Sequence, residues 1–391
     1  MITRTVVKAT SYAGEGAVRW PQSNPSPVLL KIMKIIRHPW YKPRGYVHFD
    51  EPLSRVSAER LVVNASEITK HAFYPFLRYT VETKKIKKDA ITGLVVLQDP
   101  KKRPISFAAH ADAHIYSYYC YILTKHYEER INEFGLGDSI LAFRSLGKSN
   151  IDFANQAFER INTLGGCVAF ATDISSFFDH LNHLHLKKAW TALLGVPQLP
   201  PDHYAVFKSL TKYAYVLREE LFPALGLSEN NPPRSPARLC SPSDFRCIVR
   251  GAGLVKKHAD DKGIPQGSPL SALLSNIYLI DFDKLLRADI DRRGGYYMRY
   301  CDDILCIVPT GQDKGLMELV DHLIKTYWLD RNTKKTETII FSKVSGIQVA
   351  ERPLQYLGFT FDGTRKLIRS AAFARFSEKM RRGVTSCETD R

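Results

Sequence analysis

Two apolar runs enclose a pair of acidic residues in the stretch Tyr297-Met-Arg-Tyr-Cys-Asp-Asp-Ile-Leu-Cys-Ile-Val308. Apolar runs of this length, separated by so few residues, predict a β-hairpin that presents Asp302 and Asp303 at its turn. Adjacent carboxylates in an apolar setting repel each other, so ionising both is costly unless a cation lies close by. A divalent metal ion supplies that cation, and the stretch therefore predicts a metal-binding hairpin.

A third carboxylate lies upstream, in Cys167-Val-Ala-Phe-Ala-Thr-Asp-Ile-Ser-Ser-Phe-Phe-Asp179. The apolar run predicts a buried strand that ends at Asp173, and the end of a strand lies at the rim of a sheet, where solvent and ligands have access. A helix is predicted over residues 181–194, with Asp179 as its N-cap and Gly195 as its stop. Two strands then bring three carboxylates to one place, as in-line phosphoryl transfer with two Mg²⁺ ions requires.

A stiff loop is predicted between these segments, in Gly263-Ile-Pro-Gln-Gly-Ser-Pro-Leu-Ser-Ala-Leu-Leu-Ser-Asn276. Gly267 permits a close approach of the backbone to a ligand. Pro269 suits the first turn of the helix that follows. The leucines of that helix recur at helical spacing, which predicts ordinary core packing.

Composition favours a soluble globular protein that binds nucleic acid. The 391 residues are 44% hydrophobic and carry a formal net charge of +16. A basic surface attracts the phosphates of nucleic acid. An anionic membrane would attract it too, but the sequence contains no basic amphipathic helix that could bind one. No signal peptide, membrane span or CxxC pair is recognised, so we expect a cytoplasmic protein with reduced cysteines and no structural zinc.

Other segments give coarser expectations. Residues 91–97 predict a strand, Asp99-Pro-Lys-Lys-Arg-Pro104 a turn, and residues 111–133 and 151–163 two helices. The basic and aromatic residues near His38-Pro-Trp-Tyr-Lys-Pro-Arg-Gly-Tyr46 fit either a packed extension or an RNA-binding surface. Proline-rich breaks make residues 196–262 resemble an insertion.

The order of these motifs resembles that of reverse transcriptases of the retroelement and group II intron type. The resemblance covers roughly residues 70 to 361. Its further matches are Lys102-Arg103-Pro-Ile105, Phe143-Arg-Ser-Leu-Gly-Lys-Ser149, Asn332-Thr-Lys-Lys-Thr336 and Leu354-Gln-Tyr-Leu-Gly-Phe359. A compact chain without integrase, RNase H, maturase or nuclease motifs is similar to the bacterial reverse transcriptases that defend against phage.

The resemblance implies a role for each matching residue. Asp173, Asp302 and Asp303, with the carbonyl of Ile174, would bind two Mg²⁺ ions, with Mn²⁺ as an alternative. Arg103, Phe178, Gln266 and Lys335 would contact the dNTP, with Phe178 as a steric gate against the ribose hydroxyl. The residues implied to contact nucleic acid are Lys102, Arg144, Lys148, Tyr356, Leu357 and Gly358.

The implied fold is α+β: a right-hand polymerase with fingers, a ferredoxin-like palm and a thumb that is short or absent. The expected organisation is an N-terminal extension (1–65), fingers (66–165), first palm motif (166–195), insertion (196–262), palm and primer grip (263–362) and a short basic tail (363–391). The implied partners are an RNA template or non-coding RNA, the DNA product and dNTPs. A homo-oligomer or a second protein subunit stays open, and no membrane is expected.

Two alternatives to RNA-templated DNA synthesis stay open. The same site could extend a primer without a template or from a protein hydroxyl, and a short thumb favours this reading. The chain could instead be an RNA-binding scaffold that does not use its chemistry. The histidines His180, His183 and His185 do not share one helix face, so a structural or RNA-contacting role is favoured over a metal site.

Overall fold

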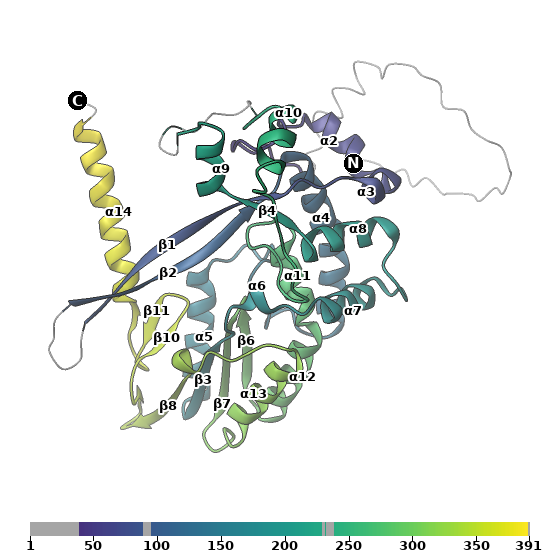
Figure 1. Ribbon diagram of the computed structural model, residues 1–391. Coiled ribbons are helices and arrows are strands. Elements are labelled where there is room, and N and C mark those ends of the chain that lie inside the picture. Colours follow the sequence, from purple (N-terminus) through teal and green to yellow (C-terminus); the bar gives the residue numbers. More distant parts are fainter. Residues whose placement is uncertain (1–38, 89–94, 229–230, 232–237, 390–391) are drawn as a thin grey trace, which may run out of the picture. The chain divides into compact units, whose positions relative to one another are not determined.

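In the computed structural model, which describes residues 39–88, 95–228, 231 and 238–389, a five-stranded antiparallel sheet carries the predicted acidic residues (Figure 1). Its order is β6-β7-β3-β8-β9, so the strand that ends at Asp173 lies in the centre. The bounds are β3 Cys167–Asp173, β6 Tyr296–Tyr300, β7 Asp303–Pro309, β8 Glu337–Val344 and β9 Ile347–Ala350.

The unit formed by Trp40–Arg391 also contains the following helices. They are α2 Arg55–Val62, α3 Ala65–Lys70, α4 His110–Glu133, α5 Asn150–Leu164, α6 Phe177–His180, α7 His183–Leu194, α8 Pro201–Thr211, α9 Arg218–Ala224, α10 Pro242–Asp244, η1 Phe245–Arg250, α11 Ser271–Tyr278, α12 Ile280–Arg292, α13 Leu316–Thr326 and η2 Thr333–Lys335. The helices predicted over 111–133 and 151–163 are confirmed as α4 and α5. None of the helices in the described ranges combines the length and apolar character that a bilayer span requires.

Both faces of β3 and β7 are buried, which explains why these two strands of the central sheet are largely apolar. Successive side chains of a strand point to opposite faces. Val168 and Phe170 of β3 belong to one buried cluster, which includes residues of α12 and α13. Cys167 and Ala169 belong to another, which includes residues of α5. The combination of helices with this sheet confirms the predicted α+β class.

A second sheet has the order β2-β1-β4-β5. Its strands are β1 Phe76–Lys88, β2 Val95–Phe107, β4 Ala214–Leu217 and β5 Lys256–Lys257. The turn predicted over residues 99–104 is wrong, because those residues continue β2 opposite β1. Of the strand predicted over 91–97, residues 95–97 lie in β2 and residues 91–94 lie outside the described residues. Residues 196–262 supply β4, which pairs in parallel with β1, so this segment is integrated into the sheet.

A third sheet follows the central one and consists of β10 Leu354–Tyr356, β11 Phe359–Phe361 and β12 Lys366–Ile368. After it comes helix α14, Ser370–Thr389. The segment predicted to be a short basic tail therefore contains a strand and a helix.

Residues 40–50 pack against α4. The ring of Tyr41 stacks on His114 with 4.9 Å between ring centres, and the Tyr46 hydroxyl donates to the carbonyl of Ala108 at 2.8 Å. The Asp50 carboxylate accepts from the backbone N–H groups of His110 and Ala111 at the start of α4, at 2.8 and 2.9 Å. This part of the predicted extension is therefore packed, whereas residues 1–38 lie outside the described residues.

Two predicted helix starts are wrong by a few residues. Asp179 lies inside the short helix α6, and Asn182 caps α7 instead, with its side chain accepting from the N–H of His185. Pro269 precedes α11, whose N-cap is Leu270, rather than lying in its first turn. Gly195 does end α7, with a left-handed φ of 67°.

Candidate active site

Three acidic residues lie near one another along the backbone, where β3 ends and the β6–β7 hairpin turns. Asp173 is the last residue of β3 and pairs directly with Asp303, the first residue of β7. Asp302 precedes Asp303 in the turn that joins β6 to β7. The predicted hairpin is thereby confirmed. The antiparallel register places Asp173, at the end of β3, directly beside Asp303, at the start of β7.

The turn of this hairpin has a fixed geometry. Cys301 adopts a left-handed φ of 59°, which is unusual for a residue with a side chain. The backbone N–H of Ile174 donates to the carbonyl of Asp302 at 3.0 Å. The residue after the β3 aspartate therefore holds the turn that carries the other two carboxylates.

Lys335 faces Asp173 in the described structure. Its ammonium forms an ion pair with the Asp173 carboxylate, whose side chain is only 7% exposed. In the described ranges no three His, Cys, Asp or Glu side chains are arranged around one metal position. The three aspartates nonetheless offer the hard oxygen donors that Mg²⁺ prefers, and the ammonium supplies the positive charge that this edge requires. Their donor set thus fits Mg²⁺.

The loop that starts at Gly263 is held on two sides. On one side, the N–H of Ile264 donates to the carbonyl of Phe178 at 2.9 Å, which brings the loop to the segment after β3. On the other side, the N–H of Ser106 in β2 donates to the carbonyl of Gln266 at 2.8 Å. The predicted nucleotide-binding residues Phe178 and Gln266 are therefore joined to one loop.

Gly267 makes a close approach, but the contact is with the protein itself. Its φ is 114°, and a Cβ at this position would lie 2.6 Å from the backbone oxygen of Ser106 and 3.2 Å from Cγ2 of Ile105. The expectation of a close approach to a ligand is therefore corrected to a close approach to β2. The Ile105 side chain marks the face of β2 on which the loop lies. Arg103 is two residues earlier in the same strand, so its side chain points to that face as well.

His183 and His185 serve the backbone. Nε2 of His183 lies 2.7 Å from the carbonyl oxygen of Gly263, and Nε2 of His185 lies 3.0 Å from that of Tyr278. Burial lowers the pKa of both imidazoles. Neutral imidazoles donate to these carbonyls, so both residues fix the chain on either side of the loop and α11.

The residues predicted to contact nucleic acid divide into two groups. Lys148 and Lys102 are exposed, and Lys102 pairs with Glu82 at 3.1 Å. Arg144 points inward: its side chain is 4% exposed and binds Glu128 at 2.7 Å as well as the carbonyls of Gly137 and Ile140. Arg144 is thus turned into the fold, and its contact with nucleic acid stays a prediction.

The predicted primer grip is a hairpin of β10 and β11. Leu357 and Gly358 form its turn with φ values of 47° and 94°, and the side-chain amide of Asn150 donates to the Leu357 carbonyl at 3.1 Å. Tyr356 is 5% exposed, and its contact with nucleic acid stays a prediction. Burial, with the nearby carboxylate of Asp303, raises the pKa of its hydroxyl.

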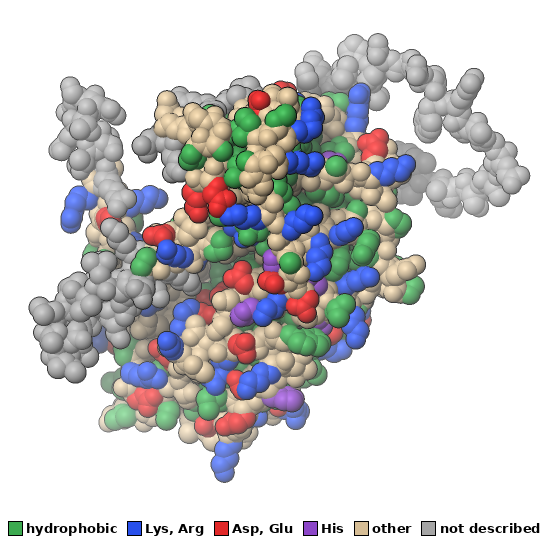
Figure 2. Space-filling view, viewed as in Figure 1, with side chains coloured by type: hydrophobic (Ala, Val, Ile, Leu, Met, Phe, Trp, Pro, Cys, Tyr) green, Lys and Arg blue, Asp and Glu red, His purple; other side chains and the backbone are tan. Residues whose placement is uncertain are grey.

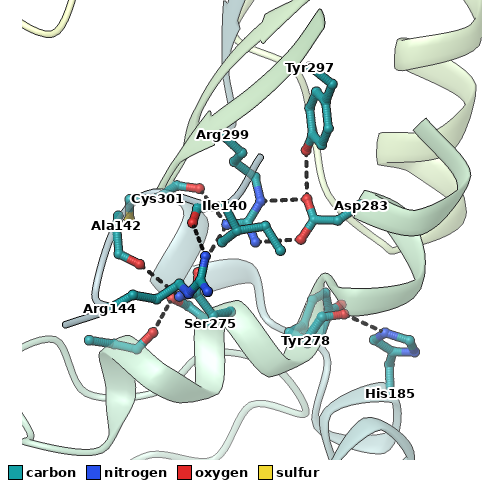
Figure 3. Close-up of polar contacts among 12 residues, drawn as sticks. Ile140, Ala142, Arg144, His185, Ser275, Tyr278, Asp283, Tyr297, Arg299 and Cys301 are labelled. Carbon is teal, nitrogen blue, oxygen red and sulfur yellow. Dashed lines mark hydrogen bonds and ion pairs between the residues drawn. The ribbon is translucent and has the colours of Figure 1, made fainter. Parts of the chain in front are cut away.

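A buried charge behind the turn was missed from the sequence. Arg299 is fully buried and pairs with Asp283 of α12 (Figure 3). The signal that could have identified this buried charge is an arginine in the stretch Tyr297–Tyr300, at a position whose side chain points to the core.

Charge is mixed on the face drawn in Figure 2. Lysine and arginine side chains are scattered among aspartate and glutamate across its described part, and acidic side chains lie near its centre. The net charge of +16 is thus not gathered into one patch on the described part of this face.

Comparison with models of protein families identifies one family. A family model described as reverse transcriptase (RNA-dependent DNA polymerase) matches residues 100–361, more than half of the chain. Apo telomerase from Candida tropicalis is similar at 12% identity and a TM-score of 0.42, over 84% of this chain and 56% of that one. Telomerase from Candida albicans in complex with a fragment of telomeric RNA gives 13% and 0.40, over 80% and 51%. The chain thus spans little more than half the length of these proteins, and no curated protein matches it.

Proposed function

The chain belongs to the reverse transcriptase (RNA-dependent DNA polymerase) family, and we propose that it copies RNA into DNA at the edge formed by Asp173, Asp302 and Asp303. The observation that carries the proposal is the direct pairing of Asp173 with Asp303, beside the turn that holds Asp302. We infer that the three carboxylates bind metal. The nucleotide would bind at the neighbouring loop, which is bonded to both β2 and the segment after β3.

Asp173, Asp302 and Asp303, with the carbonyl of Ile174, would hold two Mg²⁺ ions, whose chemistry is to activate a primer hydroxyl and to stabilise the charge on the leaving pyrophosphate. Mn²⁺ suits the same oxygen donors. Lys335 already contacts Asp173, so its ammonium is close to where the charge of a triphosphate would develop. We propose that Lys335 binds the triphosphate once it leaves Asp173.

The nucleotide would lie between the loop and β2. Arg103 points to the loop side of β2 and would bind the triphosphate through charge-assisted hydrogen bonds. Gln266 is held by its carbonyl at Ser106, which leaves its side chain to orient the nucleotide. Phe178, whose carbonyl anchors the loop at Ile264, would exclude a ribose 2′-hydroxyl by its bulk.

We further propose a role in defence against phage, together with a non-coding RNA. Support comes from the motifs, which resemble those of the retroelement and group II intron type. A plating assay with and without the wild-type chain tests this role separately from the chemistry.

The chemistry is tested with purified protein, its co-purifying RNA, labelled dNTPs and Mg²⁺. The variant Asp302→Ala/Asp303→Ala is compared with Asp313→Ala, which removes an exposed carboxylate after β7. We expect DNA from the wild type and the control, none from the double variant, and none after RNase treatment. DNA that survives RNase would favour untemplated or protein-primed extension. No DNA from any form, with the double variant still protective in cells, would leave the scaffold reading.

A further inference from the structure

A buried arginine binds the turn that carries the metal-binding aspartates (Figure 3). Nη1 of Arg299 donates to the carbonyl of Cys301 at 2.9 Å. Nε and Nη2 donate to the two carboxylate oxygens of Asp283 at 2.7 and 2.6 Å. Both side chains have 0% exposure. A bidentate pair fixes the plane of a guanidinium, and this plane directs Nη1 at the Cys301 carbonyl.

Asp283 is itself held in place. Its Oδ1 also accepts from the Tyr297 hydroxyl at 2.6 Å. Tyr297 and Arg299 lie two residues apart in β6 and point to the same face. Two side chains of this strand therefore bind the Asp283 carboxylate of α12. The network therefore joins the hairpin to α12 in one orientation.

The two carbonyls of the turn are both occupied. That of Cys301 accepts from Arg299, and that of Asp302 accepts from the N–H of Ile174. Cys301 has a left-handed φ of 59°, and such a conformation persists only where surrounding contacts hold it. A rotation of this turn would redirect the carboxylates of Asp302 and Asp303.

The same guanidinium reaches the helix that follows the nucleotide-facing loop. Nη1 of Arg299 also donates to Oδ1 of Asn276 at 3.2 Å, and the amide of Asn276 donates to the Ala142 carbonyl at 3.0 Å. Asn276 lies in α11, which begins directly after the loop. Arg299 thus contacts both the turn of the carboxylates and the helix that supports the loop.

We propose that Arg299, oriented by Asp283, is a positioning residue that sets the Cys301–Asp302 turn and thereby the affinity of Asp302 and Asp303 for divalent metal. The inference rests on the proposed function of these carboxylates. Buried ion pairs can often be replaced by apolar residues without loss of stability, so stability and positioning can be separated by experiment.

The test replaces both charges together, as Arg299→Met/Asp283→Leu, so that neither is left buried alone. A matched control is Arg293→Met at the other end of the β6–β7 hairpin. Arg293 also binds an aspartate of α12, Asp289, at 2.6 Å, and a backbone carbonyl, that of Lys314, at 2.8 Å. Three quantities are measured: the melting temperature, Mn²⁺ binding from the electron paramagnetic resonance signal of the free ion, and the Mg²⁺ concentration for half-maximal DNA synthesis.

We expect the double variant to weaken Mn²⁺ binding and to raise the half-maximal Mg²⁺ concentration about tenfold, as is typical when a residue that orients a metal ligand is lost. The KM for dNTP at saturating Mg²⁺ should stay within about twofold of that of the wild type, because the backbone bonds of the loop to Phe178 and Ser106 are retained even though the contact of Arg299 with Asn276 is lost. The control should change neither metal measurement.

A double variant that melts like the wild type and binds Mn²⁺ equally well would overturn the proposal. If the double variant does not fold, Arg299→Lys decides: its single nitrogen cannot bind Asp283 and Cys301 as the guanidinium does. Weaker Mn²⁺ binding by Arg299→Lys would support positioning, and unchanged binding would overturn it. If the wild type makes no DNA but still binds Mn²⁺ more tightly than the variant, the proposed function is refuted and the positioning role of Arg299 stands.

Discussion

Replacing Gly267 by alanine tests the contact between β2 and the loop that starts at Gly263. A Cβ at this position would lie 2.6 Å from the Ser106 oxygen, and the backbone φ of 114° is one that side chains rarely adopt. The Ser106 oxygen is a backbone atom and cannot rotate away. The loop must therefore move, and with it the Gln266 carbonyl, which accepts from Ser106 at 2.8 Å.

The magnitude follows from two separate costs. A left-handed backbone costs an alanine about 1–2 kcal/mol, and overpacking in a closely packed region costs about 1–3 kcal/mol. The free energy of unfolding of Gly267→Ala should therefore fall by about 2–5 kcal/mol. Gly311→Ala is the matched control: its φ is 87°, but nothing lies within 4 Å of the added Cβ. It should lose only the backbone part, about 1–2 kcal/mol.

Urea unfolding measures both stabilities, and DNA synthesis at saturating Mg²⁺ measures the KM for dNTP. Because misplacing a binding group by about 1 Å can cost up to a hundredfold, we expect Gly267→Ala to raise KM at least about tenfold and Gly311→Ala to leave it unchanged. Equal losses of stability in the two variants, together with an unchanged KM, would refute the close packing of the loop on β2.

Three further predictions concern single side chains. Phe178→Val should raise the ratio of rNTP to dNTP incorporation at least about tenfold, or 1.4 kcal/mol, in competition assays; an unchanged ratio would exclude a steric gate. Arg144→Met should lower the free energy of unfolding by about 2–3 kcal/mol, since its partner Glu128 is partly exposed, with no change in RNA affinity by filter binding; weaker RNA binding would restore the contact that burial argues against. Burial lowers the pKa of His48 to about 3, so the unfolded chain takes up a proton below pH 6.5 that the folded chain does not. Stability should then fall by roughly 2 kcal/mol from pH 7 to pH 5, and thermal unfolding of His48→Gln should lack this part of the slope.

The central strands could be predicted from the sequence because their signal is local. Apolar runs in β3 and β7 end or begin at an aspartate, and each prediction needs only the residues of one stretch. The pairing of Asp173 with Asp303 follows once the hairpin and the strand belong to one sheet. The helices predicted over 111–133 and 151–163 likewise depend on one stretch each, and they nearly coincide with α4 and α5.

The failures share a different cause, which is that distant parts of the chain decide the local structure. Residues 99–104 contain two prolines and charged residues that favour a turn, yet pairing with β1 holds them in β2. Arg144 is basic and belongs to a motif that resembles a fingers element, yet its side chain is buried and forms an ion pair with Glu128. Arg299 depends on Asp283 of another helix, and no local pattern states that partner.

Residues 196–262 show the same effect at the site itself. Tyr213 precedes β4, which pairs with β1, and its ring stacks on His258 with 4.6 Å between ring centres. Nε2 of His258 lies 2.7 Å from the carbonyl of Lys262, and Nε2 of His183 lies 2.7 Å from that of the next residue, Gly263. The start of the loop that contains Gln266 is therefore fixed by two imidazoles, one from this segment and one from α7. A segment without a recognisable motif thus helps to set the position of Gln266, because a loop this short transmits the placement of its first residues to those that follow.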